Sequence, residues 1–245
     1  AEMRSHNAKI DISLKPSRSD GAIRLVQFTD LHLHDNASET LLGVNTDISF
    51  AAVMQMARAG RWPPDFVLVT GDMVHSGSVM GYQRLLRELN LLQRPVFCLP
   101  GNHDNPANMR KVLNKANVST PRKVSIGRWN LILLDSTLAG REAGLLSQAE
   151  LAHLRTSLES APEAYHMICL HHPPTPIGSR WLDEMALQNP EELFGLLDSY
   201  PSARCVLSGH VHQSHESRRG AVKLFTSPST CIQFKPGRDD FAVDV

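Results

Sequence analysis

Short apolar runs alternate with amphipathic segments along most of this chain. Six runs of strand length predict buried strands at residues 24–29, 65–70, 95–99, 130–134, 165–170 and 203–208. Apolar residues recur at helical spacing between these runs and predict helices at about 47–59, 77–92, 106–117, 147–160 and 190–199. This alternation favours a largely parallel sheet covered by helices.

Two parts of the chain break the alternation. Residues 122–135 have the pattern of a hairpin that turns at Gly127 and Arg128. Beyond residue 210, an antiparallel run is indicated by three short segments at 213–217, 222–227 and 230–234. We therefore expect an α/β fold with two mixed sheets packed together and flanked by helices.

The same pattern predicts the domain boundaries. No linker interrupts residues 23–245, so we expect them to form a single domain. Residues 1–22 are interpreted as a tag remnant followed by an exposed segment. The sequence stops at FAVDV, within a strand-like pattern, so we expect that a natural C-terminal segment is missing.

Composition narrows the class of partner. The chain has 245 residues, 42% of them hydrophobic, and its formal net charge is zero, which argues against nucleic acid or an anionic membrane surface. No stretch approaches the roughly 20 apolar residues that span a bilayer. The four cysteines form no CxxC pair, and we expect buried, reduced thiols, as is usual in the cytoplasm. Oligomeric state, monomer or homodimer, stays open.

Aspartate, asparagine or histidine follows each of five predicted strands. These residues are Asp30 with His32, Asp72, Asn102 with His103 and Asp104, His171 with His172, and His210 with His212. A single polar residue at a strand end usually has no special role, but five such ends in one chain are not expected by chance. Because ligands of open α/β folds bind outside the carboxyl ends of the strands, we expect these side chains to converge.

The residue types indicate a metal site. Carboxylate and amide oxygens mixed with imidazole nitrogens suit iron, manganese, zinc or cobalt, and the absence of cysteine disfavours a structural zinc site. Seven candidate ligands are too many for one ion and suit two ions that share one carboxylate. They are Asp30, His32, Asp72, Asn102, His171, His210 and His212. Two ions roughly 3.5–4 Å apart are a common arrangement for phosphate ester hydrolysis.

These motifs together resemble the calcineurin-like metallophosphoesterase superfamily over residues 24–234. They are Asp30-x-His32, Gly71-Asp72, Gly101-Asn102-His103-Asp104, His171-x-Pro173 and Gly209-His210-x-His212. LHHPPTPIGSRWLD (170–183) and TSPSTCIQFKPG (226–237) are most similar to the bacterial class III cyclic-AMP phosphodiesterases. The Asp-Arg-Gly that follows the bridging aspartate in Ser/Thr protein phosphatases is absent after Asp72.

The resemblance implies a four-layer α/β/β/α sandwich with a dinuclear centre of iron or manganese, with zinc or cobalt as alternatives. One ion would be held by Asp30, His32, Asp72 and His212, and the other by Asp72, Asn102, His171 and His210. Asp72 would bridge the two ions. The family places the ligand directly after its strand, which selects His171 over His172.

The resemblance also implies an activity: a metal-bridging hydroxide opens 3′,5′-cyclic AMP to 5′-AMP, with His103 as general acid. Asn102, His103 and His32 would contact the substrate, and Asp104 would either orient His103 or cap the turn. For Arg180 and Trp181, packing of the loop is favoured over a base-stacking or phosphate role. For His34 and His75, near the metal motifs, a plain loop role is favoured.

Two other classes of function compete with this one. The same centre could act on another phosphodiester or a phosphomonoester, such as a 2′,3′-cyclic nucleotide, a glycerophosphodiester or a nucleotide. A nuclease is disfavoured by the neutral charge and the lack of a basic stripe. A non-catalytic scaffold is disfavoured because every candidate ligand is present.

Overall fold

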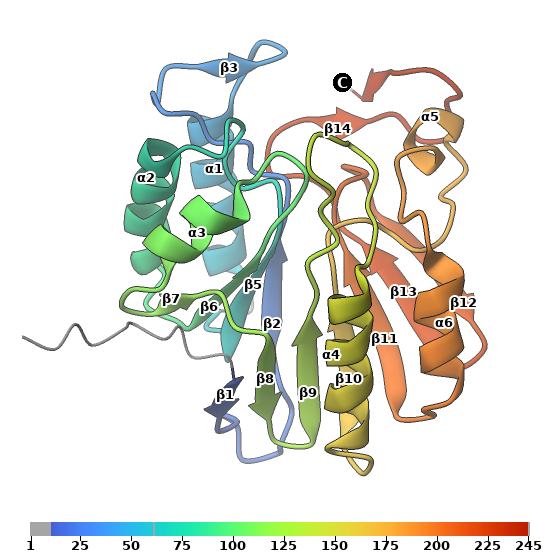
Figure 1. Ribbon diagram of the computed structural model, residues 1–245. Helices are drawn as coiled ribbons and strands as arrows, with labels where there is room; N and C mark the ends of the chain where they lie inside the picture. Colours follow the sequence, from blue (N-terminus) through green and yellow to red (C-terminus); the bar gives the residue numbers. More distant parts are fainter. Residues whose placement is uncertain (1–10, 61, 245) are drawn as a thin grey trace, which may run out of the picture.

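Two β-sheets lie at the centre of the computed structural model, which describes residues 11–60 and 62–244 (Figure 1). The smaller sheet has the order β2 (Leu25–Phe28), β5 (Phe66–Thr70), β6 (Val96–Leu99) and β7 (Val118–Ser119). The larger has the order β1 (Asp11–Leu14), β8 (Lys123–Ile126), β9 (Trp129–Leu133), β10 (Tyr165–Cys169), β11 (Ala203–Ser208), β13 (Val222–Thr226) and β12 (His215–Arg219).

Helices cover the outer face of each sheet (Figure 1). The smaller sheet packs against α1 (Thr46–Ala59), α2 (Val79–Asn90) and α3 (Pro106–Leu113), and the larger against α4 (Gln148–Glu159) and α6 (Pro190–Asp198). Ser147 caps α4 by accepting a hydrogen bond from the N–H of Glu150. The expected four-layer arrangement is therefore confirmed.

Side chains on opposite faces of the central strands pack either between the two sheets or beneath the helices. Phe66 and Leu68 of β5 pack against Leu131 and Leu133 of β9 between the two sheets. The intervening Val67 points to the opposite face and packs beneath the helices. Since side chains alternate across a strand, the fully apolar run of β5 is what a strand buried on both faces requires.

The smaller sheet differs from the expectation of two mixed sheets. All three of its strand pairs are parallel. In the larger sheet only β8–β9 and β12–β13 are antiparallel; the first is the predicted hairpin, and the second comprises the first two segments of the predicted antiparallel run. The sheet is parallel wherever a helix separates consecutive strands, because antiparallel neighbours need only a short turn.

The C-terminal part also differs. The segment predicted at 230–234 does not continue the β12–β13 hairpin; β14 (Gln233–Phe234) pairs instead with β15 (Val243–Asp244). The N–H of Thr230 donates to the carbonyl of Thr29, and the N–H of Phe234 donates to that of His212. These bonds hold the segment against the residues that follow the strand ends, so that it does not pair with β13.

The remaining elements are short. They are β3 (Thr40–Leu41), β4 (Val44–Asn45) and α5 (Arg180–Asp183). Residues 1–10 of the interpreted tag remnant lie outside the described residues, but β1 pairs with β8, so the sheet begins before the boundary expected at residue 23. None of the helices in the described ranges has the length and hydrophobicity needed to cross a lipid bilayer.

Candidate metal centre

The five polar strand ends meet at one edge of the paired sheets. Backbone hydrogen bonds join the loops directly: the N–H of Asp30 donates to the carbonyl of Gly71, and the N–H of His32 to that of Asp72. The N–H of Gly209 donates to the carbonyl of His171. The loops after β2 and β5 are thus linked within the smaller sheet, as are those after β10 and β11 within the larger.

The backbone of the candidate ligands is strained. Among the described residues, eight that are not glycine have positive φ, and five of these are candidate ligands: Asp30, His32, Asp72, His210 and His212, with φ of 54°, 47°, 50°, 72° and 47°. Each costs conformational energy and persists only where its surroundings hold it. Such residues concentrate at functional sites, so this clustering supports the site.

Two glycines allow the ligand loops to approach closely. A Cβ at Gly101 would overlap Oδ1 of Asp72 and lie 2.5 Å from its backbone nitrogen. A Cβ at Gly209 would lie 2.8 Å from Oδ2 of Asp30. The glycines that precede Asn102 and His210 therefore make room for the two carboxylates.

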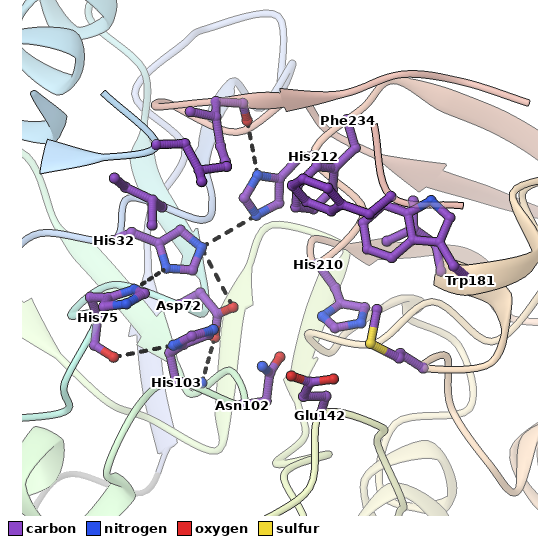
Figure 2. Close-up of a pocket in the computed structure, with 16 residues that line it drawn as sticks. His32, Asp72, His75, Asn102, His103, Glu142, Trp181, His210, His212 and Phe234 are labelled. Atoms are coloured by element: carbon purple, nitrogen blue, oxygen red, sulfur yellow. Dashed lines mark hydrogen bonds and ion pairs between the residues drawn. The ribbon is translucent and has the colours of Figure 1, made fainter. Parts of the chain in front are cut away.

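Asp72 lies at the centre of the cluster (Figure 2). Its Oδ2 is 3.4 Å from Nε2 of His171 and 3.8 Å from Nε2 of His32. Its Oδ1 accepts a hydrogen bond from the N–H of His103 at 2.9 Å, which holds the carboxylate in place. One carboxylate thus faces imidazoles from both sheets, as a bridging ligand must.

The second carboxylate and the amide complete the cluster. Oδ1 of Asp30 lies 3.3 Å from Nε2 of His212 and 3.9 Å from Nε2 of His171. Oδ1 of Asn102 lies 3.1 Å from Nε2 of His171, and Nε2 of His32 lies 3.3 Å from Nε2 of His212. The structure therefore brings these candidate ligands into direct contact.

Backbone carbonyls orient two of the imidazoles. Nδ1 of His171 bonds to the carbonyl of Thr70 at 2.7 Å, and Nδ1 of His212 bonds to that of Ile232 at 2.9 Å. Each bond leaves Nε2 directed at the carboxylates, which is the usual arrangement of metal-binding histidines. Nε2 of His210 is buried and has no hydrogen-bond partner among the described residues. The donor set fits metal ions.

Burial and mutual charge shift the pKa values of the cluster. Burial would raise the pKa of Asp30, but His212 and His171 lower it to about 2. Burial would lower the pKa of His171, but Asp72 and Asp30 raise it to about 9. Burial lowers the pKa of His210 to about 3. Without an ion, Asp30 is charged and His171 holds a proton at neutral pH.

The contacts of His172 separate it from His171. Nδ1 of His172 bonds to Oγ of Ser136 at 2.8 Å, and Nε2 bonds to the carbonyl of Glu142 at 2.9 Å. Both ring nitrogens are therefore engaged by the protein. These bonds favour His171 as the ligand and give His172 a supporting role.

Asp104 caps the turn and does not orient His103. Its carboxylate accepts hydrogen bonds from the N–H groups of Gly101 and Met73 at 2.9 and 3.2 Å, and from the hydroxyl of Tyr82 at 2.7 Å. Asp104 is also not among the residues that line the pocket. Of the two roles expected for Asp104, these hydrogen bonds favour capping of the turn, because its acceptor capacity is used to hold the loop.

His75 has a larger part than the sequence suggests. Its carbonyl bonds to Nδ1 of His103 at 3.1 Å, and its ring stacks on the ring of His103 with centroids 4.7 Å apart. Nδ1 of His75 also lies 3.3 Å from Nδ1 of His32. His75 rather than Asp104 therefore orients His103. Its position three residues after Asp72 is the only sequence signal for this role.

A pocket of about 370 Å³ opens onto the cluster (Figure 2). His32, Asp72, Asn102 and His103 line one side, together with His210 and His212. The lining residues that the sequence analysis did not identify are Leu41, Leu42, Glu142, Leu182, Met185, Ile232, Phe234 and Phe241. The volume is within the range of small-molecule sites, about 300–1,000 Å³.

The fold and this centre define a metal-dependent phosphoesterase, and comparison with known proteins agrees. The model of the family described as calcineurin-like phosphoesterase matches residues 23–214. The chain belongs to this family.

Two relatives are similar over most of the chain. It is 39% identical over 228 residues to the 3′,5′-cyclic adenosine monophosphate phosphodiesterase CpdA of Pseudomonas aeruginosa, covering 92% of this chain and 83% of that protein. It is 40% identical over 222 residues to a 3′,5′-cyclic-nucleotide phosphodiesterase of Nostoc, covering 91% of this chain and 84% of that protein.

Solved structures share the fold at low identity. A dimetal phosphatase from Danio rerio superposes with a TM-score of 0.61 at 14% identity, covering 85% of this chain and 88% of that one. At this identity the likeness shows the fold alone.

Proposed function

We propose that this enzyme hydrolyses 3′,5′-cyclic AMP to 5′-AMP at a dinuclear metal centre. The observation that carries the proposal is the convergence of carboxylate, amide and imidazole groups around Asp72, at the floor of a pocket of small-molecule size. The substrate is proposed from the names of the relatives, which are cyclic nucleotide phosphodiesterases.

The proposed ligand assignment is the one that the family resemblance implies, and contacts within the cluster support it. Asp30, His32, Asp72 and His212 would hold one ion, and Asp72, Asn102, His171 and His210 the other. Iron or manganese is proposed, with zinc or cobalt as alternatives. Bound there, the ions would polarise the phosphoryl oxygens and supply a nucleophile from water at neutral pH.

His103 is the proposed general acid. The bond from its Nδ1 to the carbonyl of His75 fixes the ring and leaves Nε2 available on the pocket side. A proton on Nε2 would pass to the leaving 3′-oxygen as the P–O bond breaks. Asn102 and His32, which line the same side of the pocket, are proposed to contact the phosphate.

The proposal also covers the location and the partners of the enzyme. All four cysteines are free, and Cys98, Cys169 and Cys205 are buried, whereas Cys231 is only partly buried. Free thiols fit a reducing compartment, and we propose the cytoplasm. We propose no nucleic-acid or membrane partner.

Hydrolysis of 3′,5′-cyclic AMP by protein reconstituted with Mn²⁺ or Fe²⁺ tests the function, with the product identified by chromatography. We expect metal-dependent formation of 5′-AMP that is lost in Asn102→Ala. Asn108→Ala is the matched control, because Asn108 bonds to the carbonyl of Gly77 and does not line the pocket. Cleavage of bis(p-nitrophenyl) phosphate without turnover of cyclic AMP would retain the hydrolase and refute the substrate.

A further inference from the structure

The side of the pocket opposite the carboxylates is aromatic. Trp181 of α5, Phe234 of β14 and Phe241, which precedes β15, form what we call the aromatic wall. None of these side chains belongs to the candidate metal centre. The wall is assembled from two segments far apart in the chain, and Figure 2 shows Phe234 between His212 and Trp181.

The wall begins at a candidate metal ligand. The ring of Phe234 stacks on His212 with centroids 4.2 Å apart and an interplanar angle of 18°. Trp181 meets Phe234 edge to face at 4.9 Å, and Phe241 meets Trp181 at 5.3 Å. A group attached to a phosphate at the metal centre would therefore lie directly against aromatic rings.

The pocket also exposes apolar surface to water. Phe241 is 56% exposed and Leu42 is 59% exposed, and both line the pocket. Apolar side chains gathered at the mouth of a pocket are typical of a site that a ligand covers. The wall is therefore more than a small core that fastens the β14–β15 hairpin.

The chemistry of the wall selects among phosphate esters. A polyol such as glycerol would need hydrogen-bond partners, whereas Trp181, Phe234 and Phe241 offer mainly ring faces and edges. A flat heteroaromatic group can stack on such rings whatever its edge pattern. We propose that the aromatic wall is a stacking platform for the nucleobase of the substrate, an inference that rests on the proposed cyclic nucleotide activity.

Recognition by stacking has a consequence for selectivity. Purines offer more ring area than pyrimidines, so the wall should favour cyclic AMP over cyclic CMP. Among the described residues of the lining, Glu142 is the one carboxylate outside the candidate ligands. The platform therefore predicts selectivity by ring area, and not by the hydrogen-bonding pattern of the base edge.

The test compares Trp181→Leu with Trp181→Phe, because leucine keeps an apolar side chain and phenylalanine also keeps a ring. For Trp181→Leu we expect kcat/KM for cyclic AMP to fall on the order of tenfold, as stacking of one base contributes about 1–3 kcal/mol. The preference for cyclic AMP over cyclic CMP should also fall. Trp181→Phe should retain most of that preference, and Phe241→Leu, at the exposed rim, should weaken it.

A purely structural role predicts a different pattern. If Trp181→Leu and Trp181→Phe lower turnover of cyclic AMP and of cyclic CMP by the same factor, so that the preference between them is unchanged, the platform is refuted. Wild-type protein that cleaves methyl p-nitrophenyl phosphate but neither cyclic nucleotide would refute the proposed function instead.

Tryptophan fluorescence tests the stacking platform independently of turnover. The chain has three tryptophans, so Trp62→Phe with Trp129→Phe leaves Trp181 as the only one. We expect AMP to quench its emission, and the absence of quenching at saturating AMP would overturn the platform.

Discussion

Ser229 holds the backbone of a candidate metal ligand. Its hydroxyl donates to the carbonyl of Asp30 at 2.7 Å and accepts the N–H of Cys231 at 2.9 Å. Ser229 is 6% exposed, and Asp30 has a φ of 54°. Ser229→Ala would therefore remove a bond that stabilises a strained residue.

The magnitude follows from these two bonds. An unsatisfied buried polar group costs about 1–3 kcal/mol, so we expect the free energy of unfolding to fall by about 2 kcal/mol. For a chain of this size, that corresponds to a decrease in Tm of roughly 4–8 °C. Loss of a group that orients a ligand typically weakens metal binding by about 10–100-fold, and we expect this for Mn²⁺.

Calorimetric titration of Mn²⁺ and thermal unfolding of the metal-free protein measure the two effects. Ser227→Ala is the matched control, because its hydroxyl donates to Oε1 of Gln27 at 2.7 Å, on the same segment but not to a ligand. We expect that variant to lose stability without losing affinity. An unchanged affinity of Ser229→Ala for Mn²⁺, or an equal loss of Mn²⁺ affinity in both variants, would refute the reasoning.

Three further predictions concern the centre itself. His103→Ala should lower kcat by about 10²–10⁴-fold while elemental analysis shows unchanged metal content, and loss of the metals would contradict the assigned role. Gly101→Ala should abolish metal binding by displacing Asp72, whereas Gly195→Ala, whose Cβ would meet nothing within 4 Å, should not. Although burial opposes it, Asp72 and Asp30 raise the pKa of His171 to about 9, so metal binding should release a proton below that pH. The affinity for the metal should thus rise as the pH increases toward 9. An affinity that does not depend on pH would contradict the release of a proton from His171.

The candidate ligands could be predicted because their signal is local. An apolar run followed at once by Asp30, Asp72 or His171 marks both the strand and its end. The parallel arrangement then brings the ends together, which is why the cluster agrees with the prediction.

The residues that were missed depend on tertiary contacts. The roles of His75 and Asp104 are decided by hydrogen bonds between the loops after β5 and β6. Phe234 and Phe241 reach the pocket only because their segment leaves the β12–β13 hairpin. Such contacts have no counterpart in the periodicity of the chain.

The metal centre is divided between the two sheets. The smaller sheet contributes every candidate oxygen ligand, from Asp30, Asp72 and Asn102, whereas the larger contributes imidazoles, from His171 and the pair after β11. Neither sheet alone could complete the proposed coordination of two ions. We therefore expect metal ions to bind late in folding, after the two sheets have packed together. Bound ions would in turn stabilise the packing of the two sheets.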